Sequence, residues 1–121
     1  KILFHTQEHN THIDVIPPNC GRLNLRFDVY DSFSYKKFFV NPHYFSYILH
    51  ESKVETYDDV EILFPSEPND LVLRFFEWVE MPEKQKHLSY VRNHFKKTQN
   101  FVKLIKQYTN IPTILLKELE G

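Results

Sequence analysis

The sequence has one cysteine, few glycines and no long hydrophobic run, and each shortage excludes a class of protein. Cys20 is the single cysteine among 121 residues, so the chain cannot form an internal disulfide. No apolar run approaches the roughly 20 residues that a membrane-spanning helix needs. We therefore expect an intracellular soluble domain, in the nucleus or cytoplasm, that does not associate with membranes.

Residue types that act in catalysis or bind metals are present, but they are not spaced for either task. Cys20 stands beside Gly21 without an activating neighbour, and two glycines make no phosphate-binding loop. Three N-terminal histidines would share one face only in a helix, and no Cys or carboxylate completes a metal site with them: His5, His9 and His12. We therefore predict that the protein is not an enzyme and uses no metal or cofactor.

Aromatic residues make up 16% of the chain, and three large rings fall in the helix that is expected to follow Pro65 and to end at Met81-Pro82. Apolar residues in this helix follow two adjacent stripes, one of Leu71, Phe75 and Trp78 and one of Val72, Phe76 and Val79. A helix that is apolar over so wide an arc belongs in the centre of a core. A surface that stacks on nucleic-acid bases would instead carry basic residues between its rings.

Residues 22–30 alternate between apolar and mostly polar side chains, which is typical of a strand with one buried face. After a turn at Asp31 and Ser32, residues 33–40 are expected to form the second strand of a hairpin. Residues 1–21 are predicted to be an N-terminal arm or an extra strand. The folded domain is then expected over residues 22–121.

The rest of the chain is expected to be mainly helical. A short amphipathic helix should cover HYFSYILHE, with Asn41 as its cap and Pro42 in its first turn. Residues 52–58 are predicted to be a polar connector, and VEILF a further strand. Ser66 or Asn69 can cap the aromatic helix that follows. Two later helices are expected, one carrying Phe101, Leu104, Ile105 and Tyr108, and one that opens at Pro112 and carries Ile114, Leu115 and Leu119.

Three passages occur in the order and spacing of a known family. They are DSFSYKKFFVNPHYFSYILHE, then VEILFPSEPNDLVLRFFEWVE, and finally NFVKLIKQYTNIPTILLKELE. Together they resemble the BTB/POZ fold and its Skp1 and elongin C relatives, and the resemblance covers residues 22–120. It implies an α+β fold in which a small sheet is wrapped by helices.

The resemblance also implies a function, that of an adaptor or oligomerisation domain that binds other proteins. Relatives that bind a cullin-type ubiquitin-ligase scaffold often carry a hydrophobic-x-Glu pattern after the first helix, and Leu49-His50-Glu51 fits it. In this family two copies meet through the first helix and an N-terminal strand. A surplus of apolar residues in the expected hairpin and first helix, from Phe33 to Ile48, makes a homodimer the expected state, with Tyr44 and Tyr47 the helix residues at the contact. The N-terminal arm could supply the strand or fold back over the same patch.

Charge is sorted along the chain although the net charge is only −1. Residues 51–83 contain ten acidic and two basic residues, and residues 84–107 contain seven basic residues and no acidic one. Aromatic residues interleave with the lysines, as in proteins that bind single-stranded nucleic acids. The alternative function is therefore a nucleic-acid-associated module that uses residues 84–106, unless the acidic block neutralises them in the fold.

Overall fold

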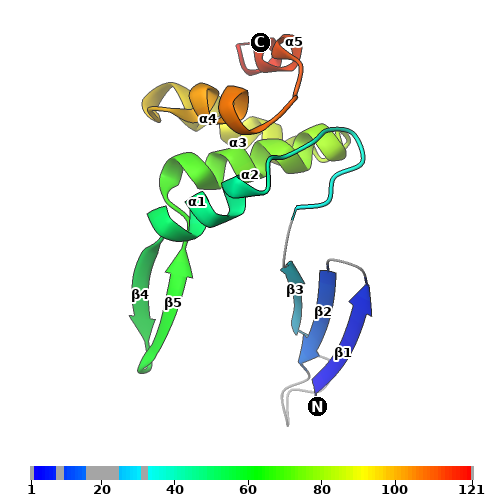
Figure 1. Ribbon diagram of the computed structural model, residues 1–121, viewed down its shortest axis with the longest axis vertical. Helices are drawn as coiled ribbons and strands as arrows, with labels where there is room; N and C mark the ends of the chain where they lie inside the picture. The colour runs from blue at the N-terminus through cyan, green and yellow to red at the C-terminus, as the bar shows by residue number, and fades with distance from the viewer. Residues whose placement is uncertain (1, 8–9, 16–24, 31–32, 121) are drawn as a thin grey trace. The chain divides into compact units, whose positions relative to one another are not determined.

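The computed structural model describes residues 2–7, 10–15, 25–30 and 33–120, and it has two compact units, Lys1–Ser34 and Tyr35–Gly121 (Figure 1). Separate antiparallel strands and helices place the chain in the α+β class. The boundary expected after residue 21 differs from this division. The reason is that β3 (Leu25–Tyr30), expected in the second unit, pairs with a strand of the N-terminal arm.

The first unit contains a three-stranded antiparallel sheet in the order β1-β2-β3. In this sheet β1 (Ile2–Gln7) pairs with β2 (Asn10–Val15), and β2 pairs with β3. The strand expected over residues 22–30 is confirmed for residues 25–30, and residues 22–24 lie outside the described residues. The arm is strand rather than helix where it is described, so the condition for three histidines to share a helical face is not met. His9 and Cys20 lie outside the described residues.

The prediction of a second strand over residues 33–40 is wrong. The segment is irregular apart from an isolated bridge between Val40 and Thr109. Side chains hold its backbone: the Glu80 carboxylate accepts hydrogen bonds from the N–H groups of Lys36 (3.0 Å) and Lys37 (3.2 Å). Asn110 Oδ1 likewise accepts from the Phe39 N–H at 2.7 Å. The alternating apolar residues of this segment therefore do not form a strand. The backbone is held by the side chains of Glu80 and Asn110 instead of by a neighbouring strand.

The first helix of the second unit is α1 (His43–Glu51), which confirms the predicted helix. Asn41 Oδ1 accepts a hydrogen bond from the His43 N–H at 2.9 Å, as expected of a capping residue. The polar connector predicted for residues 52–58 is wrong, because β4 (Lys53–Tyr57) occupies most of it and pairs with β5 (Val60–Phe64). The strand predicted at VEILF is β5. Its partner β4 includes Val, Thr and Tyr, which favour strands.

Helix α2 (Glu67–Glu80) forms the centre of the second unit and confirms the predicted aromatic helix. Ser66 takes the N-cap position in extended conformation, which decides between the two candidate caps, and Asn69 lies inside the helix and is buried. Both predicted stripes are buried: Leu71, Val72, Phe75, Phe76, Trp78 and Val79. Because so much of its circumference is covered, α2 can only be a core helix.

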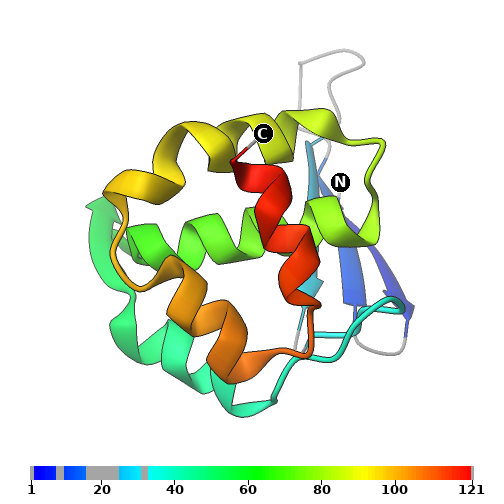
Figure 2. The ribbon, with the colours of Figure 1, turned by 90° about the horizontal axis from the view of Figure 1, so that it is seen from above.

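Three further helices and two 3-10 turns follow α2. They are α3 (Gln85–His94) with the 3-10 turn η1 (Phe95–Lys97), α4 (Phe101–Tyr108), and α5 (Thr113–Leu116) with η2 (Lys117–Leu119). Helices α3 and α4 pack on α2, and Figure 2 shows α5 crossing above it. Helix α4 is confirmed, whereas α3 was not predicted. In the last segment Leu119 is buried, but Ile114 is exposed.

The burial of Trp78 leads to a test of the core. Trp78→Ala should lower the free energy of unfolding by about 3–5 kcal/mol, because removing a buried ring leaves a cavity. Met81→Ala is the matched control, since the Met81 side chain just after α2 is exposed, and it should cost less than about 1 kcal/mol. Chemical denaturation measures both. A loss below about 1 kcal/mol for Trp78→Ala would contradict a core position.

Candidate interaction surfaces

Tyr44 of α1 is a core residue. Its side chain has 0% exposure, its ring stacks on Tyr108 with centroids 4.8 Å apart, and its hydroxyl donates a hydrogen bond to Asn69 Oδ1 at 2.8 Å. Burial, followed by the neighbouring tyrosines, raises its pKa far above the ordinary value. A side chain with no exposed surface cannot contact a second chain. The prediction that Tyr44 lies at a dimer contact is therefore corrected.

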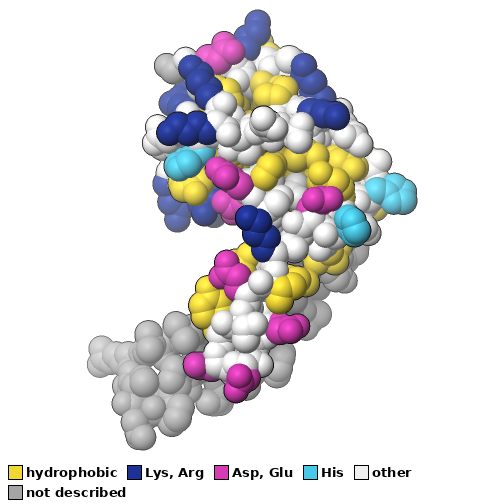
Figure 3. Space-filling model, turned by 90° about the vertical axis from the view of Figure 1, so that its left-hand side faces the viewer, with side chains coloured by type: hydrophobic (Ala, Val, Ile, Leu, Met, Phe, Trp, Pro, Cys, Tyr) yellow, Lys and Arg dark blue, Asp and Glu magenta, His cyan; other side chains and the backbone are white. Residues whose placement is uncertain are grey.

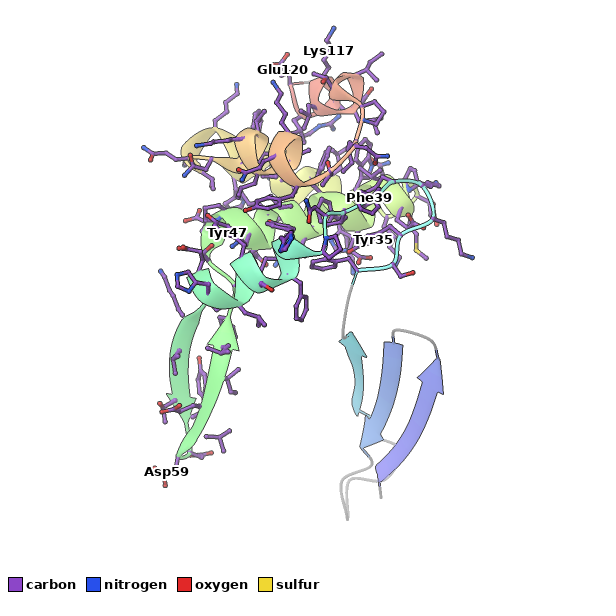
Figure 4. The ribbon with its side chains drawn as sticks, viewed as in Figure 1. Tyr35, Phe39, Tyr47, Asp59, Lys117 and Glu120 are labelled. Carbon is purple, nitrogen blue, oxygen red and sulfur yellow. The ribbon has the colours of Figure 1, made fainter. Side chains whose placement is uncertain are left out.

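Tyr47 lies one helical turn further along α1 and is half-buried (Figure 4). Its ring is 5.7 Å from that of Tyr108 and 6.2 Å from that of Tyr44. Burial and the charge of Glu51 raise its pKa. Part of the Tyr47 ring therefore stays available at the surface. Phe33 is also half-buried, and its role at an interface stays a prediction.

Leu49 and Glu51 are both exposed, with Leu49 at 48% exposure. Residues two positions apart on a helix do not face the same side. By helical spacing Leu49 shares a flank of α1 with Phe45, and Glu51 shares the other flank with Tyr47. The pattern Leu49-His50-Glu51 therefore does not form a single contact face.

Most of the apolar surplus in residues 33–48 is covered within the chain. Phe38 is buried, and its ring lies 5.2 Å from that of Phe76 in α2; the Tyr35 ring lies 5.5 Å from Phe76. Phe39 is the exception, at 61% exposure. The surplus that suggested a dimer thus leaves one Phe or Tyr ring of residues 33–48 exposed, that of Phe39, and others such as that of Tyr47 only partly accessible.

The basic residues of 84–106 lie on exposed parts of α3, η1 and α4. Six lysines are exposed and Arg92 is half-buried: Lys84, Lys86, Lys96, Lys97, Lys103 and Lys106. Within residues 33–120, the one salt bridge joins Arg74 to Asp70, so no acidic side chain pairs directly with these lysines. Figure 3 shows dark blue side chains gathered over the helices. The acidic block therefore does not neutralise this surface by direct contact.

The ring best placed for nucleic-acid stacking on this surface is already in use. Tyr90 of α3 stacks on His94 with centroids 4.2 Å apart, and the Arg74 guanidinium lies 4.0 Å from the Tyr90 ring centroid. Two groups this close to one centroid must occupy opposite faces of the ring. Phe101 of α4 is buried, as the helical spacing predicted. Phe95 and Tyr108 are half-buried, so neither of them offers a fully exposed ring on this basic surface.

The β4-β5 hairpin is the most exposed part of the second unit. Each of its ten strand residues is exposed, including large apolar side chains between 39% and 58% exposure: Val54, Tyr57, Val60, Ile62, Leu63 and Phe64. Residues 53–64 also contain four acidic residues and one lysine. Figure 3 shows yellow apolar and magenta acidic side chains along it. Sequence reasoning missed this surface because it treated residues 52–58 as a connector.

Comparisons with protein-family models, with curated proteins and with solved structures find no match to this chain. Within the described residues, none of the helices is both long and apolar enough to cross a membrane.

The buried Tyr44 phenol makes stability depend on pH. An unfolded tyrosine ionises near pH 10, whereas the folded state keeps Tyr44 protonated because its pKa is raised. The unfolded state then loses a proton that the folded state retains, so stability should fall as the pH rises above about 10. Denaturant unfolding from about pH 8 to pH 11 should show a steeper fall for the wild type than for Tyr44→Phe. Equal slopes would contradict the buried phenol.

The basic surface is expected to bind nucleic acid weakly and with strong salt dependence, because lysines attract phosphates without reading bases. Fluorescence anisotropy with a single-stranded oligonucleotide measures this, and Lys96→Glu with Lys97→Glu should reduce the binding. Lys53→Glu, on the hairpin, is the control for a change of charge elsewhere. Submicromolar affinity at physiological salt that the double variant abolishes would favour the nucleic-acid function over an adaptor.

Proposed function

We propose that the chain is a protein-protein interaction domain that acts as an adaptor or oligomerisation module. The observation that carries this proposal is the hairpin, where six large apolar side chains are exposed. Exposed apolar patches on otherwise well-packed domains commonly mark binding surfaces. In the helical part of the same unit, every Phe, Tyr and Trp ring except that of Tyr90 is buried or half-buried, so a general excess of apolar residues does not account for the hairpin.

Within this function, a BTB/POZ-like domain is the specific form that we propose. The α+β class supports it, as does the order of a helix, a two-stranded hairpin, the aromatic helix and later helices, together with the three resembling passages. Docking to a cullin-type scaffold would use Leu49 or Glu51 from one flank of α1 rather than both. Self-association would use the exposed Phe39 and the accessible part of Tyr47.

Nucleic-acid association is a second candidate, and one observation favours it. The lysines of α3, η1 and α4 are exposed and make no salt bridge with the acidic residues in the described part of the chain. Such a surface supplies electrostatic, sequence-independent attraction to phosphates. The engaged ring of Tyr90 supplies no stacking, so we rank this function below protein binding.

A photo-crosslinking amino acid at position 62 tests the proposed function in the cells that naturally make the chain. Ile62 lies on the exposed hairpin, and position 114 on α5 is the matched control because Ile114 is also exposed. We expect discrete covalent adducts from position 62 and only diffuse background from position 114.

The mass of the adducts separates the two branches of the proposal. Adducts of twice the chain mass indicate self-association, which light scattering of the purified protein at about 100 μM would then detect. Other discrete masses indicate a different partner protein. Diffuse labelling alike at positions 62 and 114 would contradict an interaction surface on the hairpin.

A further inference from the structure

The hairpin offers backbone edges as well as side chains. In an antiparallel pair, alternate residues exchange hydrogen bonds with the partner strand, and the residues between them turn their N–H and C=O groups outward. The sheet of β4 and β5 has two strands, and no backbone hydrogen bond joins either outer edge to another segment within residues 33–120. Open edges of this kind accept an added strand.

The outer edge of β5 is the better suited of the two. Successive residues of a strand point to opposite faces, so Val60, Ile62 and Phe64 lie on one face. Glu61 and Leu63 lie on the other face. Tyr57, the cross-strand partner of Val60, extends the apolar face. An incoming strand beside β5 would therefore meet an apolar row on one face and a carboxylate on the other.

Charge decides which strand fits. Residues 53–64 carry four acidic side chains, Glu55, Asp58, Asp59 and Glu61, against Lys53 alone. Two copies paired along β5 would bring these like charges together, which is how natural proteins discourage pairing of identical edges. A strand that alternates basic and apolar residues would be attracted by the same charges.

We propose that β5 binds an extended segment of a partner protein in which basic and apolar residues alternate, added as a third strand of the hairpin sheet. This proposal rests on the proposed function, because it names the partner of the hairpin surface. The apolar residues of the segment cover Ile62 and its neighbours, and its basic residues face Glu61. Figure 4 shows the labelled Asp59 at the tip of the hairpin, beyond these residues.

The structure also gives a reason for the hairpin to gain order when it is bound. A two-stranded hairpin is marginally stable in water, and a third strand adds a second row of hydrogen bonds. Asp58 and Asp59 in the turn both have positive φ, at 47° and 66°, a conformation that glycine and asparagine adopt more readily. Binding should therefore slow the exchange of hairpin amides beyond those at the contact itself.

Two capped octapeptides serve as probes, one alternating lysine with valine and one alternating glutamate with valine. Amide NMR and hydrogen exchange on the full chain follow their binding. We expect the lysine peptide to shift and protect the amides of Glu61 and Leu63, and to bind at least about tenfold more tightly than the glutamate peptide. N-methylation of alternate peptide amides should abolish the protection, because it removes the strand hydrogen bonds.

Charge variants provide the matched control. Glu61→Lys should weaken binding of the lysine peptide about tenfold, whereas Glu83→Lys, the same change at an exposed residue outside the hairpin, should leave it within about twofold. Equal binding of both peptides, or equal effects of both variants, would overturn the proposal.

If the chain itself or a second copy occupies the β5 edge, hydrogen exchange gives a different result for each. Amides on the β5 edge that are protected in the dilute chain without peptide would show that the chain covers its own edge, and protection that rises with chain concentration would show a second copy. Either result overturns the proposal. Discrete crosslinks from position 62 with no preference between peptides would retain an interaction surface and reject the basic strand.

Discussion

The second unit depends on the burial of one helix, α2, on nearly all sides. Phe75 and Phe76 have no exposed surface although they are neighbours in sequence and point in different directions from the helix. Covering both requires apolar groups from several elements. Tyr35, Phe38 and Tyr44 contact Phe76, and Phe101 contacts Phe75. The positions of α1, α4 and the irregular segment before α1 follow from this requirement.

This requirement also separates packing from interaction. Rings near α2 are used to cover it, and so Tyr44 is stacked inside while Tyr47 keeps only part of its surface. The β4-β5 hairpin extends away from α2 (Figure 1), and all of its strand residues are exposed. None of its apolar side chains is among the buried core residues of 33–120. This contrast is why the hairpin, and not α1, carries the proposed function.

Periodic patterns in the sequence predicted the elements whose buried side is clearly marked by apolar residues. They failed where contacts with neighbouring elements decide which side is buried. Two apolar stripes identified α2, and alternation identified residues 25–30. Helix α3 escaped because its core face has only two buried residues, Leu88 and Val91. For α1, sequence spacing offers Tyr44 with Ile48, and equally Phe45 with Leu49, as the inward stripe. In the structure Tyr44 and Ile48 are buried and Leu49 is exposed, because α1 packs with the first pair inward. No local signal in the sequence distinguishes the two pairs.

The sorted charges of the sequence become two separate surfaces in the second unit, an acidic hairpin and a basic face over α3, η1 and α4 (Figure 3). Identical copies that met hairpin to hairpin would repel one another. Copies that met through hairpin and basic face would attract, but such a head-to-tail contact joins different surfaces and extends into open chains unless its rotation closes a ring. The charges of neither surface therefore favour a symmetric dimer. A different molecule of opposite charge would complement each surface better than a second copy of the chain. Under the proposed adaptor function, these two surfaces of opposite charge would let one chain hold two unlike partners.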